Sequence, residues 1–540
     1  MNSAVTPSTP VPPHRPCEAL AREGLDENAV HRFFLGSDEH PIKLSPQEAR
    51  QQLGDPFARL VLLQGVFPRT AREVLDEIEQ AVPPDDPLRE GQFFLVGEGS
   101  QIAPIPGVAV NRSLRFLATV GKGTSGPDIM LSAFGPDHGT VELMAWDLEV
   151  GGFNYYRTVG ASSAWVFAGN SRHALTAPTR GNGPFESHKN GHFLMKELKF
   201  PWVHWESPAA HIDEQVLDEE GLLGHPWVAN LAPGGAYTLE DVVAKPAIQR
   251  WTKARLQALR FANSDETPRR ILEQLLTTLT VNLVSSRTSS AAAVSGAASG
   301  AVPQEVDLPE TFFVDSDALS GVLKLAPPPP PFVPSSVYAE SLRTFDVRLA
   351  DRRAAFERPG DTHFAFVVPE RAFEDTDTLR QAITQRIVSR RLAACLLMVD
   401  FPNPIFSQNR QQLLAHVPNT PFEENNDFSQ DVADAILDST AATQPGTPEH
   451  EFAQLWDVGE NFEDRFNELL QNYYTSFAER LTTQQGFDSY MRLAESRRDS
   501  VRGGDFVKPM PIAESDLLFS RTNILSQERT MQADGTVEEV

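Results

Sequence analysis

Two runs of sequence decide the fold class: Gln92-Phe93-Phe94-Leu95-Val96 and Leu114-Arg115-Phe116-Leu117-Ala118-Thr119-Val120. Both are rich in aromatic or β-branched residues and have Gly or Pro close by, as strands between turns do. Further along, Gly135-Pro136-Asp137-His138-Gly139 separates two similar runs and predicts a hairpin turn. We therefore expect a mainly antiparallel sheet over residues 90–205.

Helical patterns flank this sheet in the sequence. Before it, Thr70-Ala71-Arg72-Glu73 has the spacing of a capping box and opens an amphipathic stretch. After it, residues 246–261 are helical in pattern, and Thr267 is placed to cap a further helix that has Pro268 at its first position. We expect residues 17–284 to form a mainly antiparallel β domain with flanking helices, which makes the chain an α+β protein.

The second half of the chain has a different character. Residues 285–335 are rich in Ala, Ser and Gly and then in Pro, as flexible and stiff linkers are. Beyond them apolar residues recur at helical spacing, most clearly over residues 461–481. We expect residues 285–335 to be a linker region and 336–525 to be a mostly helical domain with a small sheet. Residues 1–16 are predicted to be disordered, and 526–540 to be a loose tail.

Composition narrows the classes of partner. The 540 residues carry a formal net charge of −26, which repels phosphate backbones and anionic lipids. We therefore expect no nucleic-acid partner and no membrane, and no run approaches the roughly 18 apolar residues that a membrane span needs. The two cysteines, Cys17 and Cys395, fit a reducing compartment, and the first residues lack a signal-peptide pattern. These features predict a cytoplasmic protein.

Several well-marked catalytic motifs do not occur in the sequence. There is no G-x-S-x-G elbow, no Walker phosphate loop, no H-E-x-x-H pair and no C-x-x-C pair. Gly121-Lys122-Gly123-Thr124-Ser125-Gly126 does match G-x-G-x-x-G after a predicted strand. A dinucleotide site needs a helix to begin there, whereas a Pro and another short apolar run follow, so we interpret this match as a loop.

Aromatic and imidazole side chains gather between Ala145 and Asn230, which hold five of the seven tryptophans and six of the thirteen histidines. Ligand pockets are mostly apolar with a few placed polar groups, and imidazole is both a metal ligand and an acid–base group. His188 and His192 have Asn190-Gly191 between them, so we expect them to meet across a turn. The residues predicted to line a cofactor or ligand site are His188, His192, His204, Trp165, Trp202 and Trp205.

One short segment of this block resembles a known family. Pro184-Phe185-Glu186-Ser187-His188 is similar to the C-x-x-C-H haem-attachment motif of the c-type cytochromes. His188 stands in the place of the axial ligand, while Pro184 and Ser187 replace the two cysteines. The resemblance implies a haem ligated by His188. Because the thiols are absent, it implies non-covalent haem at most.

Several functions stay open for this block. In the first, His188 ligates a non-covalent haem or, together with His192, a single metal ion. In the second, the block binds another small ligand. In the third, the block is purely structural. Two rivals come from other classes: a non-catalytic scaffold that binds protein partners, and a metal-dependent oxygenase or hydrolase using two histidines with Asp213 or Glu206. The preferred expectation is binding of a small ligand or cofactor, with any redox chemistry supplied by the cofactor.

Overall fold

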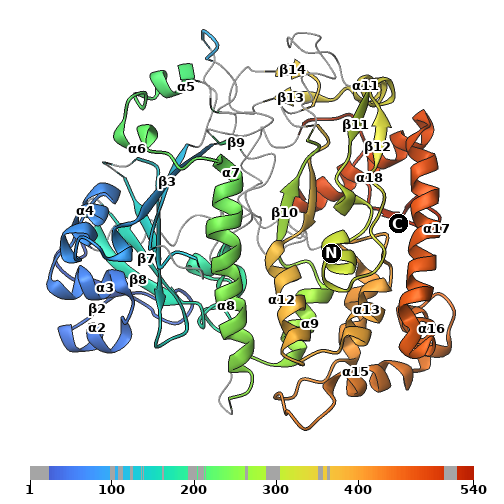
Figure 1. The fold of residues 1–540 in the computed structure, drawn as a ribbon, viewed down its shortest axis with the longest axis horizontal. Helices are drawn as coiled ribbons and strands as arrows, with labels where there is room; N and C mark the ends of the chain where they lie inside the picture. Colours follow the sequence, from blue (N-terminus) through green and yellow to red (C-terminus); the bar gives the residue numbers. More distant parts are fainter. Residues whose placement is uncertain are drawn as a thin grey trace, which may run out of the picture.

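The computed structural model has two halves that meet along one long helix, α8 (Figure 1). It describes residues 24–97, 104–107, 114–121, 126–135, 137, 139–160, 163–192, 203–204, 212, 214–261, 266–287, 304–350, 357–361, 365–503 and 520–540. The architecture is α+β, as predicted: a mostly antiparallel sheet lies in the N-terminal half (to residue 261), and the C-terminal half (from residue 266) is mainly helical with small two-stranded sheets.

The large sheet has nine strands in the order β2-β1-β8-β7-β6-β5-β4-β3-β9. Strands β3 to β8 form an antiparallel meander, and β1 pairs parallel to β8. The predicted turn falls between β5 and β6, which pair antiparallel, although residues 136 and 138 of it lie outside the described residues. The strands are β1 (Val30–Arg32), β2 (Ile42–Lys43), β3 (Gly91–Gly97), β4 (Arg115–Val120), β5 (Ile129–Ala133), β6 (Val141–Asp147), β7 (Gly152–Val159), β8 (Ala164–Asn170) and β9 (Val203–His204).

Both faces of this sheet are covered, so its central strands are buried throughout rather than alternating with solvent. One face packs against α2 (Pro46–Gln52), α3 (Pro56–Leu60) and α4 (Ala71–Ala81) (Figure 1). The predicted cap of α4 is present: the Thr70 side chain accepts a hydrogen bond from the Glu73 amide. The Glu73 carboxylate accepts from the amide of Arg69 instead of completing the box at Thr70.

The other face meets α8 (Lys245–Ala258), which follows α5 (Glu214–Glu219), α6 (Pro226–Ala229), α7 (Gly235–Thr238) and a π-helical turn (Leu239–Ala244). Helix α8 has apolar residues on two sides because it lies between the sheet and the C-terminal half. Its Trp251 indole donates to the Asn190 carbonyl on the sheet side. On its other side it packs against α12 (Phe373–Thr384).

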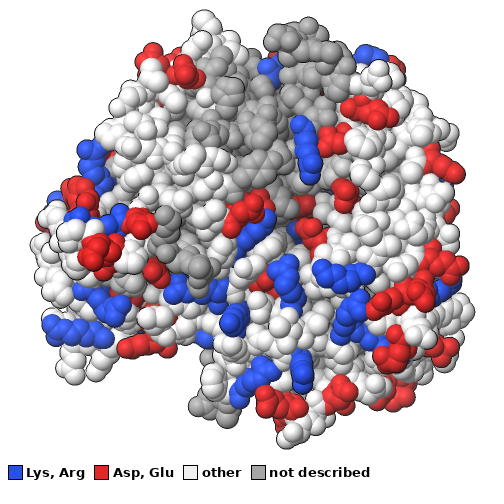
Figure 2. Space-filling model, in the orientation of Figure 1, with Lys and Arg blue, Asp and Glu red and all other residues white. Residues whose placement is uncertain are grey.

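The C-terminal half begins with α9 (Pro268–Leu276), which starts at the predicted Pro268. This helix ends at Leu276. Residues 281–284 then form a strand (β10) that pairs with β15 (Val368–Arg371). The further helices are α11 (Ser335–Thr344), α12, α13 (Arg390–Met398), α14 (Gln408–Gln412), α15 (Phe428–Leu437), α16 (Pro448–Asp457), α17 (Phe462–Leu481) and α18 (Gln484–Gly503). The helix predicted over 461–481 is therefore confirmed as α17. Acidic side chains gather over α16 and α17 on the face seen in Figure 2.

Two predicted irregular segments are ordered where the structure describes them. From residue 304 onward the predicted linker contains β11 (Glu305–Asp307), which pairs with β12 (Phe332–Pro334), and a short helix (Glu310–Phe312). Its Phe312, Phe313 and Val314 are fully buried in the C-terminal core, which holds the segment in place. The predicted loose tail likewise forms a hairpin of β16 (Arg529–Met531) and β17 (Val537–Glu539), with Met531 buried. A further pair is β13 (Arg348–Ala350) and β14 (Glu357–Pro359).

Among the described helices, none has both the length and the apolar character that a membrane span requires. Residues 1–16 and the Ala/Ser/Gly-rich stretch of 288–303 lie outside the described residues.

Candidate functional site

The predicted histidine segment forms two short 3-10 helices, Gly183–Glu186 and Lys189–Gly191, on the sheet face that meets α8. The expected turn between His188 and His192 is present, with Asn190 in the left-handed conformation at φ 57°. Its geometry is fixed by one carbonyl group. The Tyr155 hydroxyl donates to the His192 carbonyl at 3.0 Å, and His188 Nδ1 lies 3.1 Å from the same oxygen.

The two imidazoles have different surroundings. The His188 ring is half-buried and packs on the Tyr155 ring at a centroid distance of 5.2 Å. The His192 ring is completely buried, and neither of its nitrogens has a hydrogen bond. The carboxylate of Glu374 of α12 lies near it, with Oε2 4.0 Å from His192 Nδ1. Burial lowers the pKa of His192 well below its ordinary value, so this imidazole is neutral.

Trp165 does not share a cavity with these histidines. It stands opposite Thr158 in the β7–β8 pairing, and side chains alternate along a strand, so Trp165 projects from the face opposite to Tyr155. There its indole donates to the Pro68 carbonyl at 2.8 Å and its ring packs on Phe57 of α3. The predicted pairing of Trp165 with His188 in one pocket is therefore wrong, because the sheet lies between them.

The remaining predicted residues are only partly described. His204 lies in β9, where its backbone pairs with Val96, and its side chain is outside the described residues. Trp202, Trp205, Glu206 and Asp213 also lie outside them. These four residues stay predictions.

The described residues do not fit the haem that the resemblance implied, or the metal ion considered for His188 and His192. The tryptophan expected beside His188 is on the other face of the sheet. No group of three or more His, Cys, Asp or Glu in the described part of the chain is arranged to hold a metal ion. We derive no chemistry through either group.

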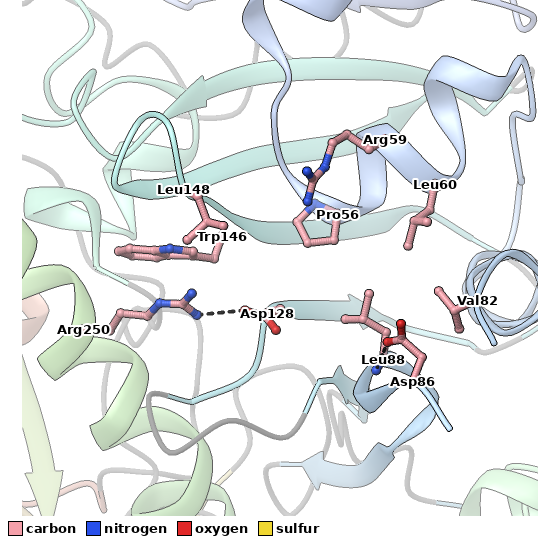
Figure 3. A pocket seen from close by; sticks show the side chains of 10 residues that line it. All are labelled: Pro56, Arg59, Leu60, Val82, Asp86, Leu88, Asp128, Trp146, Leu148 and Arg250. Atoms are coloured by element: carbon pink, nitrogen blue, oxygen red, sulfur yellow. Dashed lines mark hydrogen bonds and ion pairs between the residues drawn. The ribbon is translucent and has the colours of Figure 1, made fainter. Parts of the chain in front are cut away.

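The structure instead shows a pocket that the sequence did not indicate, which we call the α3–α8 pocket (Figure 3). It has a volume of about 470 Å³ and opens between α3, the short helix Pro87–Arg89, strand β6 and α8. Its apolar wall consists of Pro56, Leu60, Val82, Leu88, Trp146 and Leu148, and its charged groups are Arg59, Asp86, Asp128 and Arg250.

Arg250 and Trp146 form the end of the pocket nearest α8. The Arg250 guanidinium lies over the Trp146 ring, 4.1 Å from its centroid, as in a cation–π contact. It also donates to Asp128 Oδ1 at 3.0 Å (Figure 3). Burial lowers the pKa of Arg250, and the Asp128 carboxylate opposes that shift. The cation–π contact and the ion pair together fix the position of the Arg250 guanidinium.

The other two charged groups differ in how they are bound. Asp86 accepts a hydrogen bond from the Leu88 amide at 2.8 Å and so caps its short helix. Arg59 lies in the last turn of α3 and is exposed. Within the described part of the chain, its guanidinium has no hydrogen-bond or ion-pair partner. Arg59 is thus the cation of the pocket that is available to a ligand.

The rim of the pocket carries an exposed apolar side chain. Leu148 follows β6 and is 74% exposed, although it points over the same opening as Trp146 (Figure 3). An exposed leucine beside a concave wall is a surface that a ligand can cover.

A smaller cavity of about 270 Å³ lies between α12, α13 and α15, lined by residues such as Ile383, Arg386 and Phe422.

Comparison of the chain with models of known protein families, with characterised proteins and with solved structures found no match.

Proposed function

We propose that this protein binds a small organic molecule in the α3–α8 pocket. The observation that carries the proposal is the combination of volume and wall: about 470 Å³ lined by six apolar residues and four charged ones. Ligand sites typically have about 300–1,000 Å³ and an apolar lining with a few polar groups that set orientation. The proposal keeps the expected class of function, small-ligand binding, and moves the site away from His188.

We assign a binding role to the pocket. Asp128 is paired with Arg250, and Asp86 accepts from a backbone amide. We also propose that the protein is located in the cytoplasm. The buried Cys395 has a free thiol, as is usual in that reducing compartment.

The test uses a neutral apolar probe, phenylnaphthylamine, whose fluorescence rises when it leaves water. Wild-type protein should bind it saturably. Leu148→Glu should weaken binding about tenfold, since covering a leucine contributes roughly 1.5–3 kcal/mol. Because Leu148 is exposed, the substitution leaves the core intact.

The matched control is Leu223→Glu. Leu223 is 56% exposed and does not line the pocket, so its replacement should leave probe binding unchanged. Absence of saturable binding in the wild type, or an equal loss in both variants, would overturn the proposal.

A further inference from the structure

We infer that the ligand of the α3–α8 pocket is an amphipathic organic anion and that Arg59 binds its acid group. This inference rests on the proposed binding function and adds the chemical class of the ligand. The pocket wall carries four charged side chains, two arginines and two aspartates. Their sum is zero, yet they are not equally available to a ligand.

Three of the four charges are already engaged within the protein. Arg250 and Asp128 form an ion pair at 3.0 Å, which leaves that end of the pocket close to neutral. Asp86 accepts from the Leu88 amide. A ligand that used Arg250 or Asp128 would have to compete with their ion pair, at a cost of about 1 kcal/mol or more for a hydrogen bond, and the Asp86 carboxylate would repel an acid group. Arg59 has no such interaction to lose.

The backbone that carries Arg59 is held firmly in place. Helix α3 is capped by Asp55, whose side chain accepts from the Ala58 amide at 3.0 Å. The two residues before Arg59 in this helix, Phe57 and Ala58, are fully buried against the sheet. Arg59 therefore projects away from the core, and Figure 3 shows its guanidinium over the opening beside Pro56. A guanidinium carried by a firmly held helix is suited to bind a charged group of a ligand.

The chemistry of guanidinium selects the ligand class. Its planar array of donors matches the two oxygens of a carboxylate, sulfonate or phosphate, and charged hydrogen bonds of this kind are roughly twice as strong as neutral ones. The remainder of the wall is apolar, from Leu60 and Leu88 to Leu148. The matching ligand thus has an acid group at one end and an apolar body that covers these leucines.

The overall charge of −26 does not oppose this assignment. Exposed charges farther away than about 8 Å are largely screened at physiological ionic strength, so the nearest charges dominate at the pocket. There Arg250 and Asp128 are paired, and the Asp86 carboxylate accepts from the Leu88 amide, so Arg59 is the cation available to an acid group.

The experiment compares two probes that differ by one acid group: anilinonaphthalene sulfonate and the neutral phenylnaphthylamine. In Arg59→Gln, binding of the sulfonate should weaken about tenfold or more, as expected for loss of a charged hydrogen bond. Binding of the neutral probe should change less than about twofold, since its apolar contacts remain. Arg50→Gln is the control, because Arg50 is exposed on the neighbouring helix α2 and outside the pocket.

The outcomes separate the two proposals. If neither probe binds the wild type, the binding function itself is overturned. If both probes bind but Arg59→Gln leaves the sulfonate unaffected, or weakens both probes equally, the anion assignment is overturned while the pocket stands. If Arg50→Gln weakens the sulfonate as much as Arg59→Gln does, the effect is one of general charge, and the assignment to Arg59 fails.

Discussion

The N-terminal sheet has a buried polar cluster beyond each of its faces, and the two clusters are built differently. The first, which we call the α3 cluster, consists of Asp55, Asp147, Asn154 and Tyr156. Its carboxylates accept hydrogen bonds from neutral donors: Asn154 donates to Asp55 at 2.8 Å and to Asp147 at 3.0 Å, and the Tyr156 hydroxyl donates to Asp55. All four residues belong to the N-terminal half, and the cluster fixes α3 on the sheet.

The second, the α12 cluster, consists of His192, Arg255, Glu266, Gln274, Glu374, Asp375 and Asp377 and joins the two halves. Arg255 of α8 donates to Glu266 at 2.7 Å and to Gln274 at 2.7 Å, and Gln274 in turn donates to Asp375 at 2.7 Å. Here an ion pair links Arg255 of α8 to Glu266, just before α9, and Gln274 extends the contact through α9 to Asp375 of α12. The comparison shows two uses of buried polarity: hydrogen bonds within the N-terminal half orient one helix, whereas an ion pair extended by hydrogen bonds joins the two halves.

Removing the central charge of the α12 cluster should have the largest effect. Arg255 is 1% exposed, so Arg255→Met leaves the Glu266 carboxylate buried without its cation. We expect the free energy of unfolding to fall by about 3–5 kcal/mol, measured by urea unfolding. The control is Arg260→Gln, which breaks the exposed pair with Glu424 and should cost less than about 1 kcal/mol. Equal effects of the two substitutions would contradict the role given to the buried pair.

The same cluster should give the protein a distinctive pH dependence. Burial raises the pKa of Asp377 on α12 to about 6, with the nearby Arg380 opposing the shift. The folded state therefore holds a proton that the unfolded chain has lost above pH 4. The stability that this group contributes is complete below about pH 4 and is lost as the pH rises through about 6.

Asp377→Asn removes that proton equilibrium. Relative to the wild type, the variant should gain stability between pH 4 and 7, by up to about 3 kcal/mol at 1.36 kcal/mol for each unit of pKa. The measurement is the free energy of unfolding at a series of pH values. Asp464→Asn, at an exposed position of α17, is the matched control. A variant profile parallel to that of the wild type would show that Asp377 is ionised in the folded protein at low pH as well.

Local sequence signals predicted the elements of the fold well. The start of α9 at Pro268 and the connection between β5 and β6 follow from the chemistry of a few adjacent residues. Thr267 takes the N-cap position, but its side chain donates to Asn419 instead of capping the helix. The core position of Phe313 does not, because it depends on contacts with distant residues such as Phe477 of α17, whose ring stacks on it at 4.5 Å. Composition alone therefore made that segment resemble a linker.

The site was less predictable for a geometric reason. Trp165 and His188 are close in sequence, but the strand pairing decides which face each side chain reaches, and a shift of one residue reverses it. The α3–α8 pocket draws its residues from separate segments around positions 56–60, 82–88, 128–148 and 250. No spacing motif connects them. Among the described histidines of this block, His192 lies at the contact between the halves, whereas His173 and His225 contact residues of the N-terminal half.

The smallest effect is expected at His192, and it tests the comparison most directly. Both ring nitrogens of His192 lack hydrogen bonds, so His192→Leu removes no hydrogen bond and relieves an unsatisfied polar group. We expect the free energy of unfolding to change by less than about 1 kcal/mol in either direction. Asn154→Leu in the α3 cluster removes donors to two buried carboxylates and should cost about 1–3 kcal/mol. If His192→Leu proves as costly as Asn154→Leu, His192 has a partner in solution, and its pairing with Glu374 across 4.0 Å becomes the first contact to examine.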